Sequence, residues 1–177
     1  CGVLEVGCGQ GDLLATVVQR LQAKAGGRTI DALGVDGSPG AILTCCGRYP
    51  SLHWAADSLE HFLVTHDDIA LDDAGRPRRY DLVLDKTGAI FIDSYEAACA
   101  YFARIDALMR PGARYVYIAS RHYYDEVLSK KNYADWPRDW LAIAAATWTP
   151  EALHDDVAPA LRGYLKRVFR KGAGNAG

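Results

Sequence analysis

The residues of this chain best suited to chemistry form one short glycine-rich segment, Glu5-Val6-Gly7-Cys8-Gly9-Gln10-Gly11. It follows an apolar run that predicts a strand, and a helical pattern begins directly after it. Glycines in such a turn let the backbone approach a ligand closely, and the start of the helix offers free N–H groups to an anion. The segment indicates a ligand-binding loop. A tight strand-to-helix turn without a ligand is the alternative.

The spacing of the glycines discriminates between cofactors. The dinucleotide-binding pattern G-x-G-x-x-G requires glycine at position 12, where this chain has Asp12. The pattern present is G-x-G-x-G with an acid, Glu5, two residues before its first glycine. This difference argues against a nicotinamide dinucleotide as the ligand.

A second candidate group ends the next predicted strand, where Asp36 is followed by Gly37 and Ser38. A carboxylate here can accept hydrogen bonds from both hydroxyls of a ribose, as in doubly wound folds that bind nucleosides. It follows the glycine loop by about the length of one helix and a returning strand. An Asp in such a place is also a common turn residue or helix cap. Because it accompanies the loop, we favour ribose binding.

Two more acids end the third and fourth predicted strands. Asp57 is followed by Ser58, and Asp85 is followed by Lys86. Asp57 is also a suitable N-cap for a following helix, which is the structural alternative for this residue.

Taken in chain order, these segments resemble the motifs of class I S-adenosylmethionine-dependent methyltransferases. The glycine loop resembles the family's first motif, and Arg110-Pro111-Gly112-Ala113 resembles the turn before its fifth strand. Asp85-Lys86 is similar to the protein-lysine branch of the methyltransferase-like proteins. That branch usually continues with Gly-Thr, where this chain has Thr87-Gly88. The resemblance covers the chain from Val3 to about Lys171.

The resemblance implies S-adenosylmethionine as the cofactor. The implied cofactor-binding residues are Glu5, Gly7, Cys8, Gly9, Gly11, Asp36, Gly37, Ser38, Asp57, Ser58 and Asp85. Among them, Glu5 suits the ammonium of the cofactor's methionine part, and Asp57 corresponds to the acid that receives the adenine amino group. Asp85 is the candidate catalytic residue, either taking the proton of a lysine acceptor or anchoring the ammonium.

The elements that must position these residues alternate between strand and helix, which is typical of an α/β fold with a doubly wound, mostly parallel sheet. Strands are expected at Gly2–Gly7, Ala32–Asp36, Leu52–Ala56, Tyr80–Leu84, Ala113–Ala119, Trp140–Thr149 and Gly163–Arg170. The segment Trp140–Thr149 is ambiguous because of its alanines. Helices are expected at Asp12–Ala25, Pro39–Tyr49, from Leu59 onward and at Ser94–Met109, with an irregular segment at 121–138. We therefore expect a Rossmann-like sheet of seven strands with helices on both faces and one antiparallel strand near the C-terminal end.

Length and composition predict a single domain over residues 1–171 with a flexible tail at 172–177. A net charge of −2 argues against a general nucleic-acid partner, which normally requires a basic excess. No apolar run approaches the ~20 residues of a membrane span, so we expect a cytoplasmic protein. The scattered Cys and His residues indicate no metal site. Because a strand begins almost at Cys1, we expect a further segment before it.

The leading functional interpretation is methyl transfer to a protein lysine side chain, with a small-molecule acceptor nearly as well supported. Aromatic residues near 121–140, among them Tyr123 and Trp136, are suited to face an acceptor or to pack as a lid. A nicotinamide-dependent oxidoreductase and a non-catalytic binding domain of the same fold are the two other classes. The sequence indicates no oligomeric state.

Overall fold

The computed structural model describes residues 1–57, 75–86, 92, 94–120, 141–152 and 164–173. Several sequence predictions lie outside these residues: the helix from Leu59 onward, the segment 121–138 with its aromatic residues, the cofactor contact at Ser58, and positions 174–177 of the predicted tail.

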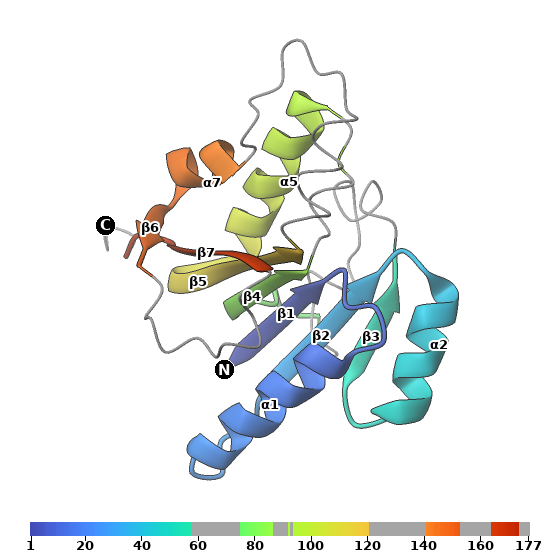
Figure 1. Cartoon of the computed structure of the whole chain (residues 1–177). Helices are drawn as coiled ribbons and strands as arrows, with labels where there is room; N and C mark the ends of the chain where they lie inside the picture. Colours follow the sequence, from blue (N-terminus) through green and yellow to red (C-terminus); the bar gives the residue numbers. More distant parts are fainter. Residues whose placement is uncertain (58–74, 87–91, 93, 121–140, 153–163, 174–177) are drawn as a thin grey trace.

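The described part of the chain contains one seven-stranded sheet (Figure 1). Its strands are β1 (Gly2–Val6), β2 (Asp31–Asp36), β3 (His53–Ala56), β4 (Tyr80–Lys86), β5 (Met109–Ser120), β6 (Thr149–Glu151) and β7 (Tyr164–Arg170). They are ordered β3-β2-β1-β4-β5-β7-β6, and β7 runs antiparallel to both of its neighbours while the other pairs are parallel. The predicted doubly wound sheet with one antiparallel strand is therefore confirmed.

Helices cover both faces of this sheet. The described helices are α1 (Asp12–Lys24), α2 (Pro39–Arg48), α5 (Tyr95–Leu108) and α7 (Leu141–Thr147). Alternate residues of β1 separate the two sides, because Val3 packs with α1 residues and Leu4 packs with α5 residues. Both faces are buried, which is why the central strands are mainly apolar in the sequence.

Local sequence signals explain where the helices begin. Ser38 caps α2 by accepting a hydrogen bond from the Ala41 backbone N–H, and Pro39 occupies the first turn. Ser94 caps α5 in the same way through the Ala97 N–H. The α1 helix lacks a side-chain cap and begins directly after Gly11, which has a left-handed backbone. The start of α1 is therefore continuous with the glycine loop.

One predicted strand is wrong. The segment predicted as a strand at Trp140–Thr149 contains helix α7, and the strand that follows, β6, is only three residues long. Alanine-rich sequence favours a helix. Ala144 and Trp148, four residues apart, are both buried in the core that α5 covers. Their spacing is helical, and packing against α5 decides the outcome.

None of the helices within the described residues has the length and apolar character that a membrane crossing requires.

Candidate functional site

The glycine loop joins the end of β1 to the start of α1 at the carboxyl ends of the central strands (Figure 1). Gly9 and Gly11 have φ angles of 55° and 81°, a backbone region in which side chains with a Cβ are strained. The Cys8 N–H donates to the Val35 carbonyl oxygen at 3.0 Å, which ties the loop to β2. A Cβ added at Gly9 would meet nothing within 4 Å among the described residues, so they leave this side of the loop open.

Asp36, at the end of the neighbouring strand β2, binds the glycine loop through its carboxylate. Its Oδ2 accepts a hydrogen bond from the Gly9 N–H at 2.8 Å, and its Oδ1 accepts one from the Ser38 N–H at 2.8 Å. Each carboxylate oxygen has a second lone pair for a further donor. The carboxylate is thus oriented by two backbone groups and still able to accept from a ligand. Gly37, between Asp36 and Ser38, is exposed.

Glu5 lies beneath the loop and is fully buried. Its Oε2 accepts a hydrogen bond from the Leu14 N–H at 2.9 Å, at the start of α1. Its Oε1 has no hydrogen-bond partner among the described residues. Desolvation raises the pKa of this carboxyl to about 8, against the opposing effects of the Lys86 charge and the Leu14 hydrogen bond. A cation brought near Oε1 would favour the ionised form.

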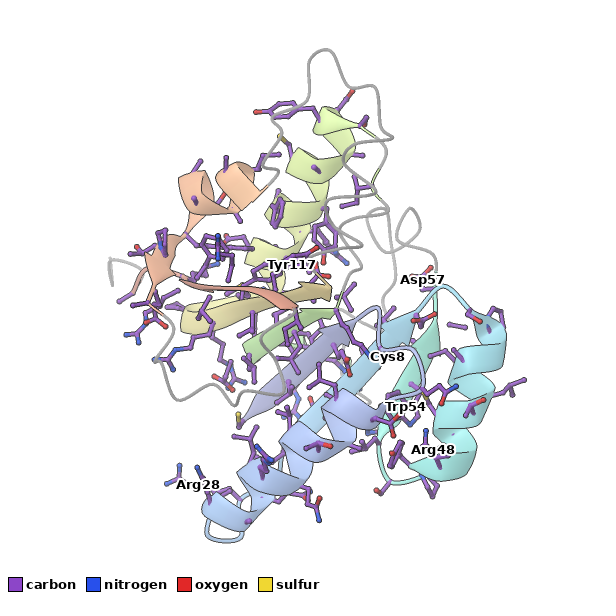
Figure 2. All side chains as sticks on the ribbon, viewed as in Figure 1. Cys8, Arg28, Arg48, Trp54, Asp57 and Tyr117 are labelled. Atoms are coloured by element: carbon purple, nitrogen blue, oxygen red, sulfur yellow. The ribbon has the colours of Figure 1, made fainter. Side chains whose placement is uncertain are left out.

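Asp57 follows β3 and lies next to Asp36. Its backbone N–H donates to the Asp36 carbonyl oxygen at 3.0 Å, and its side chain is 8% exposed. Figure 2 shows Asp57 at the end of β3, on the same edge of the sheet as the glycine loop. The structure therefore brings together the loop, Asp36, Ser38 and Asp57 as the sequence predicts.

Asp85 has a different environment. It is fully buried, and its Oδ2 accepts hydrogen bonds from the Tyr101 hydroxyl at 2.7 Å and the Tyr115 hydroxyl at 2.6 Å. Burial and the neighbouring Asp85 carboxylate raise the pKa of both tyrosines well above the usual range. Asp85 accepts from Tyr101 of α5, whereas Glu5 accepts from Leu14 of α1, so the two carboxylates lie on opposite faces of the sheet. Their strands are adjacent, and Asp85 pairs with Val6 in the register.

Several residues at the site carry no sequence signal. Tyr101 and Tyr115 are 16 and 30 residues from Asp85 along the chain, and only the packing of α5 and β5 brings them to it. Cys45, on α2, donates its thiol hydrogen bond to the Gly9 carbonyl oxygen at 3.2 Å, although 36 residues separate them. In the sequence both kinds of residue are indistinguishable from ordinary core positions.

All five cysteines are free thiols. In the part of the chain that the structure describes, no three His, Cys, Asp or Glu side chains are grouped so as to hold a metal ion.

No protein-family model matches the chain, and no curated protein matches it in sequence. Many solved structures share its architecture. The N-methyltransferase NodS from Bradyrhizobium japonicum WM9 has a TM-score of 0.68 and 16% identity, over 97% of this chain and 85% of NodS. NodS was also solved with S-adenosyl-L-homocysteine, with a TM-score of 0.67 and 15% identity over 96% of this chain and 77% of that one.

A TehB-like SAM-dependent methyltransferase from Corynebacterium glutamicum has a TM-score of 0.60 and 17% identity, over 96% of this chain and 79% of that one. The chain has a methyltransferase fold. At such identities the likeness concerns the architecture, and the activity has to be argued from the residues of this chain.

Proposed function

We propose that this protein is an S-adenosylmethionine-dependent methyltransferase that methylates an amine nitrogen. The observation that carries the proposal is the pairing of Gly9 with Asp36. An open glycine loop and an oriented carboxylate meet at the carboxyl ends of β1 and β2, in a sheet with the strand order of a methyltransferase fold. In doubly wound sheets this edge is where a nucleoside-containing cofactor binds.

The described residues fit three polar groups of such a cofactor. We assign the ribose hydroxyls to Asp36, whose oxygens have spare lone pairs after accepting from Gly9 and Ser38. We assign the adenine amino group to Asp57. We assign the ammonium of the methionine part to Glu5, whose Oε1 has no hydrogen-bond partner among the described residues and whose ionised form a nearby cation would favour.

The bound sulfonium would supply an activated methyl group for an in-line displacement. Such a reaction requires little acid–base chemistry, so the chain contributes mainly by aligning the reactants and excluding water. The glycine loop, which Asp36 holds, and the buried strand ends would align the reactants and exclude water.

An amine acceptor must be unprotonated when it attacks. The sequence predicts Asp85 either for this proton transfer or for anchoring the ammonium. Asp85 is fully buried, and its Oδ2 already accepts hydrogen bonds from two tyrosine hydroxyls. We therefore propose that Asp85 positions the end of β4, with Tyr101 and Tyr115, instead of removing the proton.

We propose a protein lysine side chain as the first acceptor to test, on the basis of the Asp85-Lys86 pair. A small-molecule amine is the second, because NodS is an N-methyltransferase with the same fold. Incubation of the protein and methyl-labelled cofactor with a dialysed protein extract and, separately, with its small-molecule fraction distinguishes the two. Label on lysine in the protein fraction supports the first acceptor, and label only in the small-molecule fraction contradicts it.

The cofactor is tested by calorimetric titration with S-adenosyl-L-homocysteine, with NAD titrated in parallel. We expect micromolar binding of the homocysteine compound and none of NAD. Asp36→Ala should abolish binding, and Glu96→Ala, which removes an exposed acid at the start of α5, should leave it unchanged. Circular dichroism of each variant checks that the fold persists. Binding of NAD alone would indicate an oxidoreductase, and no binding by the folded chain would overturn the proposal.

A further inference from the structure

A small buried cluster supports the glycine loop from behind. It consists of Cys8 of the loop, Ile42 and Cys45 of α2, and the partly buried Trp54 of β3. We call it the loop seat. Figure 2 shows Cys8 and Trp54 close together where the loop passes between β1 and α1. The loop is therefore held by side chains from two other elements as well as by its own glycines.

Within the loop seat, both buried thiols donate to the loop backbone. The Cys45 thiol donates to the Gly9 carbonyl oxygen at 3.2 Å, and the Cys8 thiol donates to the same oxygen from 3.9 Å. Cys45 is 0% exposed and Cys8 is 1% exposed. Burial raises the pKa of both thiols, so both keep the proton that they donate at neutral pH.

Trp54, on β3, packs against the glycine loop and β2. A Cβ at Gly11 would lie 2.6 Å from the indole, and one at Gly34 would lie 2.4 Å from it. The indole is itself fixed, because its Nε1 donates to the Tyr49 carbonyl oxygen at 3.0 Å. The backbone of the loop thus rests directly on a rigid aromatic ring.

Gly9 is the residue on which these contacts converge. Its N–H is bound by the Asp36 carboxylate and its carbonyl oxygen by the Cys45 thiol, on two different elements. Among the described residues, a Cβ added at Gly9 would meet nothing within 4 Å. The peptide groups around Gly9 are therefore held from the protein side and free on the side that a ligand would approach.

We propose that Cys45 is a positioning residue for cofactor binding, holding the glycine loop in its binding conformation through the Gly9 carbonyl. The role rests on the proposed function. A loop held in place before binding loses less conformational entropy when the ligand arrives. Without the thiol, the Gly9 carbonyl loses a donor and the left-handed glycine backbone has more conformations available.

The test compares three variants in titrations with S-adenosyl-L-homocysteine. Cys45→Ala removes the donor, Cys45→Ser replaces it with a hydroxyl donor of similar size, and Cys46→Ala removes the exposed neighbouring thiol as a control. We expect Cys45→Ala to weaken binding by about three- to tenfold, the value of one hydrogen bond. Cys45→Ser should restore most of the affinity, and Cys46→Ala should match the wild type.

Two further readouts separate positioning from a loss of general stability. In methyl-transfer assays, Cys45→Ala should raise KM for the cofactor with little change in kcat, because the chemical step is untouched. Hydrogen exchange should become faster at the Gly9 and Gly11 amides of the unliganded variant, with rates in the β4–β5 core unchanged.

The outcomes distinguish this role from the function on which it rests. If the wild type binds S-adenosyl-L-homocysteine and Cys45→Ala binds equally well, the positioning role is wrong and the proposed function stands. Equal loss in Cys45→Ala and Cys45→Ser also overturns the role, because it attributes the effect to packing. If the folded wild type does not bind, the proposed function and the positioning role both fail.

Discussion

The acids of the site show how the surroundings of one functional group change its behaviour. Asp36 is half-buried and accepts two backbone N–H groups, which orient its carboxylate. Glu5 is fully buried with a single backbone donor, and desolvation there outweighs the opposing charge of Lys86. In the unliganded protein, Glu5 is therefore mainly protonated at neutral pH, and a bound cation would shift it toward the carboxylate.

This shift predicts a pH-dependent stability. The pKa of Glu5 is about 8 in the folded protein against 4.5 for the free group, so the folded state retains a proton that the unfolded state releases. The stabilising contribution is complete below pH 4.5 and is lost as the pH rises toward 8, with a slope of up to about 1.4 kcal/mol per pH unit. Glu5→Gln removes the titration.

The measurement is the free energy of unfolding by urea, from pH 5 to pH 9, for the wild type and Glu5→Gln. The wild-type value should fall relative to that of the variant up to about pH 8 and then run parallel to it. A constant difference across this range would contradict the raised pKa.

At the scale of elements, the close packing of β2 on β3 predicts a steric effect. The Cβ of Gly34→Ala would lie 2.4 Å from a ring carbon of Trp54, whose indole is held by Tyr49 and by the loop seat. Since the ring cannot move freely, we expect a loss of about 1–3 kcal/mol in the free energy of unfolding.

Gly47→Ala is the matched control for this substitution. Gly47 lies within α2, and a Cβ there would meet nothing within 4 Å. Alanine is the better helix former, so this variant should gain up to about 1 kcal/mol. Denaturant unfolding measures both, and equal effects of the two substitutions would show that Trp54 does not restrict Gly34.

On the face of the sheet that α5 covers, a group of polar contacts links α5 to the residues that follow α7 and β7. Asp106 of α5 accepts from the Trp148 Nε1 at 2.8 Å and from the Lys171 Nζ at 2.9 Å, beyond the ends of α7 and β7. We expect Asp106→Ala to lower the free energy of unfolding by about 1–3 kcal/mol, because it leaves two partly buried donors without this acceptor.

The comparison for these polar contacts is the exposed ion pair between Arg110 and Asp81, with a nitrogen–oxygen distance of 3.1 Å. Both side chains are substantially exposed, so Arg110→Ala should cost less than about 1 kcal/mol. An Asp106→Ala variant no less stable than Arg110→Ala would show that the polar contacts of Asp106 contribute nothing beyond a surface pair.

At the scale of the whole molecule, ligand binding and stability are linked. A ligand that binds only the folded chain stabilises it by about 2.7 kcal/mol at a concentration 100 times its Kd. For a domain of this size, S-adenosyl-L-homocysteine should then raise Tm by about 5–10 °C. Asp36→Ala should show no such rise, measured by differential scanning fluorimetry. A rise of equal size in that variant would place the ligand elsewhere.

The arrangement of the whole sheet follows closely from the sequence. Strands such as β1 and β2 are buried on both faces, so they appear as mainly apolar runs, interrupted in β1 by the buried Glu5. The helices carry their own start signals, such as Ser38 with Pro39. The prediction was wrong at α7, where a short apolar segment is compatible with either structure and packing on α5 decides.

The sequence alone predicts the strands β1 to β5, the helices α1, α2 and α5, the glycine loop and the placement of Asp36 and Asp57 at strand ends. These features depend on residues close together in the chain. The tertiary structure alone decided that Asp85 is enclosed by two tyrosine hydroxyls and that the Cys45 thiol lies on Gly9. Such contacts join residues 16 to 36 positions apart, and they form only when the order of the strands and the side on which each helix packs bring them together.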